Sequence, residues 1–99
     1  MSHLVTERET PEGLLVSVCD RDVLGETFEN GEVSLSVDES FYGGDAAEAG
    51  DVVDSLSRAT VANIVGTRSV ELAIEHGFVD ETTVLEVDGT HHAQVLRLP

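Results

Sequence analysis

The 99-residue sequence contains no lysine and no tryptophan, a single cysteine and only two prolines. A lone cysteine excludes an intramolecular disulfide and any metal site built from cysteines alone. Aromatic residues make up only 4% of the chain, so there are few rings on which unpaired nucleobases could stack. Without lysine there is no phosphate-binding loop of the usual type, and no glycine-rich nucleotide signature is present. These absences argue against several common kinds of ligand site.

Positive charge is scarce as well: five arginines stand against 20 aspartates and glutamates, and the formal net charge is −15. Such a surface repels itself in dilute buffer but is tolerated in molar salt, where the Debye length falls to about 3 Å. We therefore predict a cytosolic protein of a halophile, in which solvation accounts for most of the acidic residues. Acidity is then a weaker argument against nucleic acid, because counterion release contributes little at high salt.

Long apolar runs are also missing. None approaches the roughly 20 residues that a membrane-spanning helix needs, and residues 1–13 are too polar for a secretion signal. We expect one domain over residues 1–99, located in the cytoplasm and not in the membrane. Its core should consist of Val, Leu, Ile and Ala, because hydrophobic residues reach 40% with few aromatics among them.

Alternating and β-branched segments predict several strands. Residues 1–12 fit either a first strand or a loose arm, and residues 14–19 form the clearest strand. Two more strands are predicted at 83–87 and 93–98, joined across residues 88–92. His91 and His92 would then lie at the end of a hairpin.

Asn30-Gly31 is the strongest hairpin signal in the chain, because both residues tolerate positive φ. A two-residue loop at this point predicts that Phe28 lies opposite Val33 and Glu29 opposite Glu32. Two acids in that position destabilise a hairpin in ordinary buffer and do so much less at high salt.

Helical spacing begins at Asp51, which is predicted as the N-cap after a polar connector over residues 45–50. A second helix is predicted over residues 68–76, with Gly77 as its left-handed cap. Residues 60–65 fit either a continued helix or a buried strand, and their β-branching favours the strand. The expected fold is α+β or α/β: a small mixed, mostly antiparallel sheet of four to six strands with two helices on one face.

The glycine pair Gly43-Gly44 follows two aromatic residues and indicates either a close backbone approach or a sharp exit from the sheet. Asn63 stands in a mostly apolar segment, where a buried amide must be hydrogen-bonded. It fits either a bridge to the backbone or a group that recognises a ligand.

Few residues carry obvious chemistry. A thiol and an imidazole form a nucleophile and base when the fold brings them together, so Cys19 and His92, oriented by Asp20 or Asn63, are the catalytic candidates. The competing interpretation is that Cys19 packs as a small hydrophobe. Neighbouring strand residues point to opposite faces, so only one of His91 and His92 could serve a given site. We expect no metal and no cofactor.

Five short motifs stand in order along the chain: Cys19-Asp20 with Leu24-Gly25 and Phe28; Phe41-Tyr42-Gly43-Gly44; Ala62-Asn63-Ile64-Val65-Gly66; Ala73-Ile74 with Gly77; and His92-Ala93-Gln94-Val95. Together they resemble an archaeal family of unknown function, DUF424, from about Leu14 to Leu98. The resemblance implies a stand-alone α/β domain and no activity, because none is established for the family. It also singles out certain positions: Cys19, Asp20, Tyr42, Gly43, Asn63, Gly66 and His92. At His91 the family more often has a proline.

Two functions remain open. The first is a non-catalytic binding or adaptor module in archaeal information processing, with a protein or RNA partner from the translation machinery. The second is a small enzyme that uses Cys19 and His92. A homodimer formed through an exposed sheet edge is compatible with either. We expect the binding residues to be Tyr42, Gly43, Asn63, Gly66 and His92.

Overall fold

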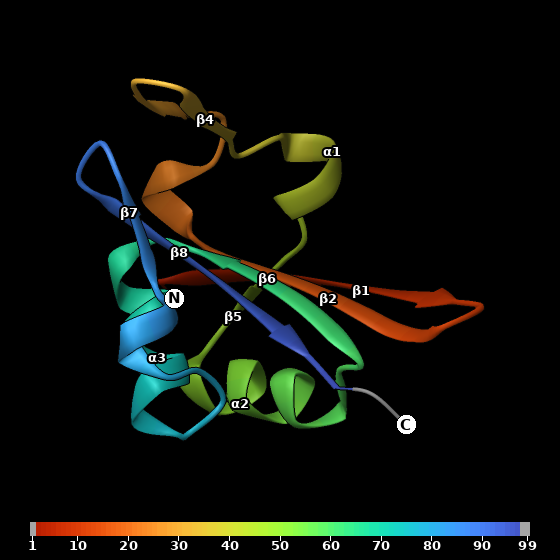
Figure 1. Ribbon diagram of the computed structural model, residues 1–99. Coiled ribbons are helices and arrows are strands. Elements are labelled where there is room, and N and C mark those ends of the chain that lie inside the picture. The colour runs from red at the N-terminus through yellow and green to blue at the C-terminus, as the bar shows by residue number, and fades with distance from the viewer. Residues whose placement is uncertain (1, 98–99) are drawn as a thin grey trace.

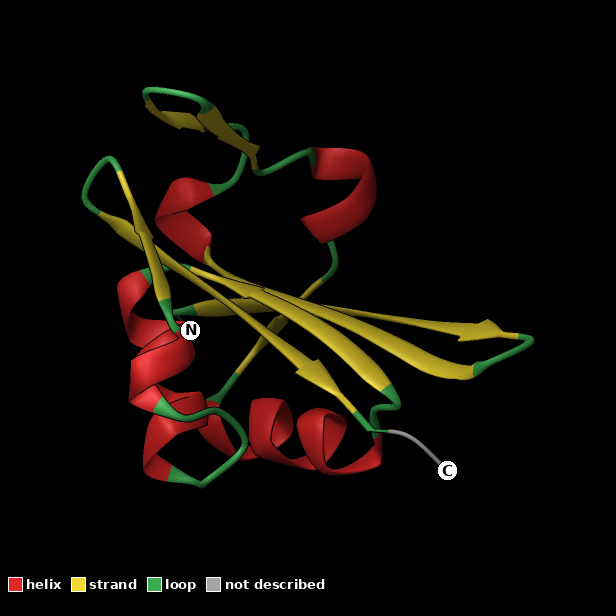
Figure 2. Cartoon of the chain, in the orientation of Figure 1, coloured by secondary structure: helices red, strands yellow, loops and turns green. Residues whose placement is uncertain are grey.

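The computed structural model describes residues 2–97 and contains a six-stranded sheet, a separate two-stranded hairpin and three α-helices (Figures 1 and 2). In chain order the elements are β1 (His3–Thr10), β2 (Gly13–Asp20), the 3-10 turn η1 (Arg21–Val23), β3 (Thr27–Asn30), β4 (Val33–Ser36), α1 (Glu39–Tyr42), β5 (Asp45–Ala47), α2 (Ala49–Arg58), β6 (Val61–Val65), α3 (Thr67–Glu75), the 3-10 turn η2 (Glu81–Thr83), β7 (Leu85–Val87) and β8 (Thr90–Leu96). No helix within residues 2–97 has the length and apolar character needed to cross a membrane.

The large sheet has the strand order β5-β1-β2-β6-β8-β7. At its centre β2 and β6 run parallel, whereas its other pairings are antiparallel. Parallel neighbours need a long crossover connection, and residues 21–60 supply it. The predicted α+β fold with a mixed, mostly antiparallel sheet is confirmed.

Helices α2 and α3 cover one face of this sheet, the lower one in Figure 1. They enclose the main core, which takes side chains from both helices and from alternate positions of β2 and β6. Eight of these side chains are fully buried: Val16, Val18, Val52, Leu56, Ala62, Ile64, Val70 and Ala73. Burying a Val or Leu side chain stabilises a fold by roughly 1.5–3 kcal/mol, so the two helices owe their position to this contact.

The opposite face of the sheet is only partly covered. We call residues 21–44, which include η1, the β3–β4 hairpin and α1, the cover; they lie above the sheet in Figure 1. Beneath the cover is a second core of buried residues: Leu4, Cys19, Val37, Tyr42 and Val65. The cover's two strands pair with each other and form no ladder with the large sheet. The cover is therefore held by side-chain packing and a few loop hydrogen bonds.

Four expectations for single segments or residues are settled by the structure. Residues 3–10 form a strand, β1, paired along its whole length with β2. Residues 61–65 form the favoured strand, β6, and residues 67–75 form the predicted helix α3, after which Gly77 has φ +77°. Gly44 makes the predicted close approach, because a Cβ there would collide with the Val5 carbonyl oxygen.

The predicted polar connector over residues 45–50 is wrong. Asp45–Ala47 form β5, which pairs with β1, and α2 begins two residues later at Ala49. Glu48 is the N-cap, and Asp51 stands at the third helical position, where its Oδ2 accepts the Glu48 N–H at 3.1 Å. This reciprocal capping box uses the acid that we expected as the cap itself. A three-residue strand is too short to show a period, so it left no signal in the sequence.

The predicted register of the β3–β4 hairpin is also wrong. Phe28 pairs with Leu35, Glu29 with Ser34 and Asn30 with Val33, so Gly31 and Glu32 form the turn. A shift by two residues leaves every side chain on the same face, so alternation could not distinguish the two registers. The observed one brings the half-buried Phe28 and Leu35 together against the second core.

The last hairpin turns earlier than predicted. Its two-residue turn is Asp88-Gly89, with φ of 49° and 87°, so β8 starts at Thr90 and His91 and His92 lie within the strand. Thr83 belongs to η2 and not to β7. The predicted end of the strand at Leu98 lies outside the described residues.

Candidate functional site

The candidate site is the part of the sheet that neither the helices nor the cover conceal. Side chains alternate across a strand, so the residues between those that face α2 and α3 point to this side. We call this uncovered area the open face. On this side of the sheet, including the part beneath the cover, the ladder registers align the side chains in three rows that run across the strands.

The middle row is polar on all four strands. Thr6 pairs with Ser17, Ser17 with Asn63 and Asn63 with Gln94. Ser17 is buried, whereas the side chains of Asn63 and Gln94 reach the surface. The Gln94 side chain donates from Nε2 to Asn63 Oδ1 at 2.9 Å, and this orients both amides. Asn63 Nδ2 and Gln94 Oε1 remain to donate to and accept from a ligand. The Thr6 hydroxyl is buried and has no hydrogen-bond partner within residues 2–97.

A second row is apolar and consists of Leu15, Val61 and Leu96. Leu96 is 68% exposed, the most exposed of the large hydrophobic residues in the described part of the chain. On β1 the neighbour of Leu15 is Arg8, whose guanidinium carbon lies 5.2 Å from the centre of the Phe41 ring. An apolar surface of this kind is what a binding partner would bury.

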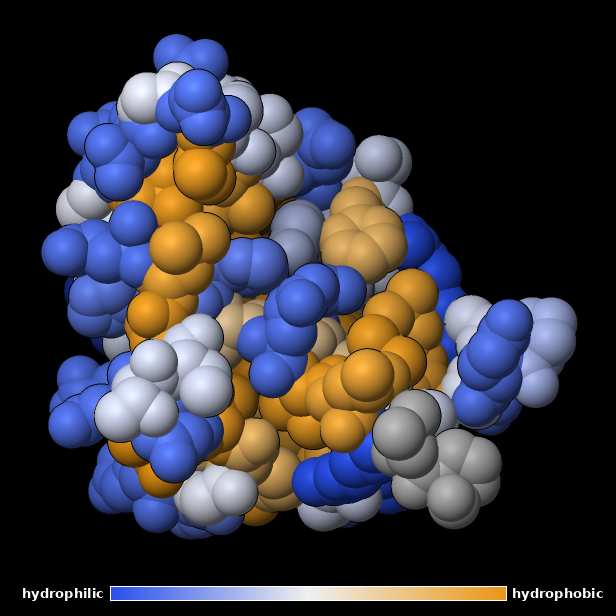
Figure 3. All heavy atoms as spheres, viewed as in Figure 1, coloured by the Kyte–Doolittle hydropathy of each residue, from blue (hydrophilic) through white to orange (hydrophobic). Residues whose placement is uncertain are grey.

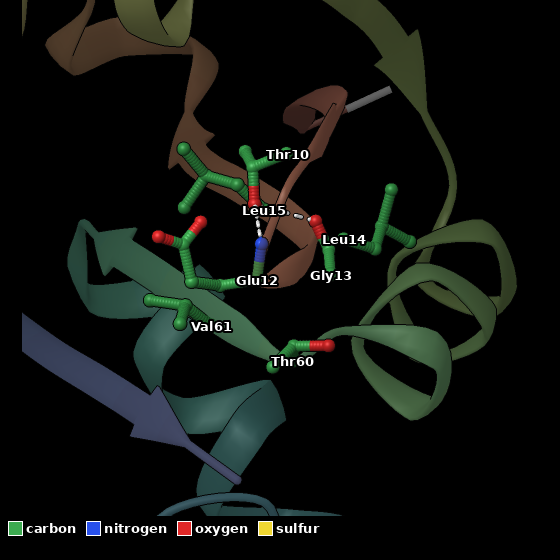
Figure 4. Close-up of a pocket in the computed structure, with 7 residues that line it drawn as sticks. All are labelled: Thr10, Glu12, Gly13, Leu14, Leu15, Thr60 and Val61. Atoms are coloured by element: carbon green, nitrogen blue, oxygen red, sulfur yellow. Dashed lines mark hydrogen bonds between the residues drawn. The ribbon is translucent and has the colours of Figure 1, made fainter. Parts of the chain in front are cut away.

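At one end the apolar row meets a cavity of about 250 Å³, shown in Figure 4. It is a notch between the β1–β2 turn and the start of β6, and Leu15 and Val61 help to line it. Thr10 rigidifies the turn, because its hydroxyl donates to the Gly13 carbonyl at 2.7 Å and accepts the Glu12 N–H at 3.3 Å. The notch extends the apolar surface of the open face.

The third row runs from beneath the cover into solvent. Cys19 and Val65 are buried in the second core, whereas His92 is half-buried and Leu85 is 46% exposed. In Figure 3 hydrophobic residues gather over the hairpin and β7, and again over the ends of β2, β6 and β8, with hydrophilic residues between them. The open face thus combines two apolar areas with a polar centre.

The structure does not bring Cys19 and His92 into contact. Both belong to the third row, but Val65 on β6 stands between them, so their Cα atoms are about 10 Å apart at ordinary strand spacing. Cys19 is fully buried, and burial together with nearby Asp20 and Asp22 raises the pKa of its thiol to about 12. Its Sγ lies 3.9 Å from the Tyr42 carbonyl oxygen. This environment opposes thiolate formation and fits packing.

Asp20 anchors the start of α3. Its carboxylate accepts the backbone N–H of Arg68 at 3.0 Å and both the N–H and the hydroxyl of Ser69 at 2.8 Å. Gly66 has φ +114°, and any Cβ there would collide with the Asp20 carboxylate. Both residues therefore have structural roles, because together they satisfy the free amides at the helix start.

Ser69 also bonds to His3, at 2.8 Å between Oγ and Nδ1. The order is aspartate, serine, histidine, so the serine hydroxyl donates to the carboxylate and cannot be activated by the imidazole as in a catalytic triad. Ser69 is fully buried. Burial lowers the pKa of His3, which favours its neutral ring.

The remaining predicted binding residues divide between scaffold and surface. Tyr42 is buried in the second core, and burial raises the pKa of its hydroxyl to about 12. Gly43 ends α1, where a Cβ would collide with the Glu39 carbonyl. Only Asn63 and His92 lie on the open face, and burial lowers the pKa of His92.

Several residues of the open face were not predicted: Thr6, Leu15, Val61, Leu85, Gln94 and Leu96. The alternation of His92, Gln94 and Leu96 would have indicated one exposed face of β8, but the rows form only when four strands are aligned. Within residues 2–97 no three His, Cys, Asp or Glu side chains gather closely enough to hold a metal ion.

Comparison with protein families gives a match over residues 7–98 to the model described as "Protein of unknown function (DUF424)". This chain belongs to the DUF424 family. The resemblance seen in the sequence motifs is thereby confirmed, and the match covers nearly the whole chain.

A solved structure shares the fold of this DUF424 chain. It is the crystal structure of an uncharacterized conserved protein from Methanopyrus kandleri, with a TM-score of 0.77 and 22% sequence identity. The alignment covers 98% of this chain and 95% of the other. At that identity the similarity establishes the architecture alone. Comparison with curated proteins found no match.

Proposed function

We propose that this DUF424 chain is a non-catalytic binding module, an adaptor in cytosolic information processing, whose partner docks on the open face. The observation that carries the proposal is the apolar row ending in the 68% exposed Leu96, set beside the oriented amides of Asn63 and Gln94. Apolar contacts would supply affinity, and the two amides would reject partners that leave them unpaired.

Charge favours a protein partner over RNA. Four of the five arginines have neighbours that use their charge or their N–H groups. Arg8 lies on Phe41, Arg58 bonds Glu7 and Asp54, Arg68 pairs with Asp22 at 3.6 Å, and Arg97 donates to the Ser57 and Ala59 carbonyls. Little positive charge is left for phosphates, whose contacts supply most RNA affinity. With a net charge of −15, the chain complements a partner with basic residues around an apolar contact.

The enzyme alternative needs a thiol and an imidazole in contact, whereas Cys19 and His92 are separated by a strand.

A pull-down with the tagged full chain from a halophile lysate at molar KCl tests the proposal. The open-face variant Asn63→Ala/Leu96→Asp should reduce recovery of the partner protein about 30-fold, the effect of losing roughly 2 kcal/mol at a contact centre. The control Glu71→Ala/Glu75→Ala, on the exposed side of α3, should recover as much as wild type. Equal losses in both variants, or no recovered protein at all, would contradict the proposal. RNA recovered in place of protein would assign the face to RNA.

A further inference from the structure

One edge of the large sheet is unfinished. The ladder between β7 and β8 ends at the pair Leu85 and His92, but β8 continues to Leu96. Residues 93–96 therefore have a neighbouring strand only on the β6 side. We call this segment the free edge.

Two backbone bonds establish which groups point outward from the free edge. Gly66 N donates to His91 O and Arg97 N to Thr60 O, both at 2.8 Å, and they bracket the β6–β8 ladder. Bonding alternates along an antiparallel pair, so Ala93 and Val95 bond to β6. The N–H and C=O groups of Gln94 and Leu96 project from the free edge. Within residues 2–97 no other segment's backbone bonds to these four groups.

There is room beside the free edge for another strand. The chain that precedes β7 turns away from β8 through η2, so no strand lies beside residues 93–96 in the direction in which β7 would extend. A cavity of about 380 Å³ occupies this position and is lined by Thr83, Leu85, His92, Ala93 and Gln94. Leu85, which lines this cavity, is 46% exposed, and Leu96, at the end of the free edge, is 68% exposed.

The opposite side of the sheet shows what a protected edge looks like. β5 pairs with β1 only at residues 3–5, and the exposed remainder of β1 carries Glu7, Arg8 and Glu9 in succession. Consecutive charges discourage the addition of another strand. The free edge of β8 consists of Ala93, Gln94, Val95 and Leu96 and carries no charge. The exposed part of β1 therefore has the composition of an edge that is protected against strand addition, whereas the free edge of β8 has the composition of one that can accept a strand.

We propose that the free edge of β8 is a strand-addition site that takes an extended peptide segment of the partner. The inference rests on the proposed function and specifies how the partner binds. Backbone N–H and C=O groups in strand spacing recognise another extended backbone, and pockets beside them select alternate side chains. Leu85 and Leu96 favour an apolar residue on the open-face side of the segment. Basic residues flanking the segment would match the acidic surface.

The test uses the full chain and a phage-displayed library of random 12-residue peptides, selected in 1 M KCl so that non-specific attraction is screened. Gln94→Pro removes an outward N–H without breaking a β6–β8 bond, and proline is accepted on edge strands. Gln94→Ala removes the same side chain but keeps the N–H. Glu9→Pro deletes an N–H from the exposed edge of β1.

Selected peptides should bind Gln94→Pro at least tenfold more weakly than Gln94→Ala and should bind Glu9→Pro like wild type. Should Gln94→Pro fail to fold, the same peptides are N-methylated at alternate residues, and one of the two methylation patterns should abolish binding to wild type. No enrichment from the library, or equal affinity for Gln94→Pro and Gln94→Ala, would overturn the inference.

Two further measurements separate this inference from two alternatives: a homodimer formed through the free edge, and a partner that binds the open face without adding a strand. Sedimentation of wild type and Gln94→Pro shows whether the free edge pairs with a second copy of the chain. If wild type forms a dimer and Gln94→Pro does not, the free edge binds that second copy and not a peptide. If a native partner is lost from Asn63→Ala/Leu96→Asp but retained by Gln94→Pro, the proposed binding function stands and the strand-addition site is wrong.

Discussion

Asp20 shows how a single acid can look catalytic in the sequence and be structural in the fold. It is nearly fully buried and accepts three hydrogen bonds from the start of α3. Asp20→Ala should therefore lower the free energy of unfolding by about 3 kcal/mol, because it removes a helix cap and leaves buried Ser69 donors unpaired. Urea denaturation at constant salt measures the change.

Asp22 provides the matched control for this substitution. It is exposed and pairs with Arg68 at 3.6 Å, so Asp22→Ala should change stability by less than about 0.5 kcal/mol. If the two variants lost similar stability, the capping role assigned to Asp20 would be wrong.

His3 and His92 make stability depend on pH. Burial lowers the pKa of both rings below the ordinary value, and around His3 this outweighs the attraction of Asp20 and Glu48. As the pH falls below about 6.5 the unfolded chain takes up protons that the folded chain resists, so stability falls. Above about pH 7.5 both rings are almost entirely neutral in both states, and they add little pH dependence.

Denaturation at pH 7.5 and 5.5 in molar KCl checks this expectation. Wild type should lose stability at the lower pH, and His3→Gln/His92→Gln should lose less. The acids with lowered pKa values, Glu7 and Asp80, lose their contribution only at lower pH, below their ordinary range near 4. If the double variant lost as much stability as wild type between pH 7.5 and 5.5, groups other than these two histidines would carry the pH dependence.

At the scale of elements, the cover is a separate unit with its own core. Cys19 lies fully buried beneath it and is the chain's only thiol, so its labelling reports when the cover opens. We expect a thiol reagent at pH 8 to label Cys19 at least tenfold faster than global unfolding would allow, because local opening needs less free energy.

Two substitutions separate opening of the cover from global unfolding. Phe28→Ala should speed labelling about tenfold with little effect on the main core, because Phe28 packs only in the second core. Leu56→Ala removes a fully buried side chain of the main core and should lower global stability by about 2–5 kcal/mol. Labelling that follows global stability in both variants would show that the cover does not open by itself.

Elements with a clear period were predicted well, and those without one were not. The strand over residues 14–19 and the helix over residues 68–76 correspond to β2 and α3, since a buried face enforces their patterns. β5 and α1 are too short for a period. The hairpin at Asn30 was misaligned, because packing of Phe28 and Leu35 outweighed the preference of the turn residues.

At the scale of the whole molecule, charge should govern stability. With a net charge of −15, repulsion destabilises the compact state at low salt and is screened at high salt. We expect the melting temperature to rise by roughly 10 °C between 0.1 and 2 M KCl, equivalent to about 2 kcal/mol for a domain of this size. Scanning calorimetry across that range measures it.

The cover offers a way to confirm the cause of this salt effect. Glu26, Glu29 and Glu32 are exposed there, and Glu26→Gln/Glu29→Gln/Glu32→Gln reduces the net charge without touching either core. This variant should gain less from salt than wild type. The charge argument would be refuted if the melting temperature did not depend on KCl, or if the variant's melting temperature rose with KCl as much as that of wild type.

The sequence by itself determined the family, the α+β class and the acidic surface, because motif order, hydrophobic period and charge are properties of the chain read in order. It also pointed to Asn63 and His92, which do lie on the open face. It could not separate them from Asp20, Tyr42, Gly43 and Gly66, which serve the scaffold.

The tertiary structure alone decided which residues share a surface. The rows of the open face and the unpaired end of β8 exist only because β2 and β6 are brought side by side and β7 stops after three residues. Cys19 and His92 were kept apart by the same alignment, which inserts β6 between their strands. Contacts between distant segments depend on register and strand order, and neither leaves a mark in the local pattern of residues.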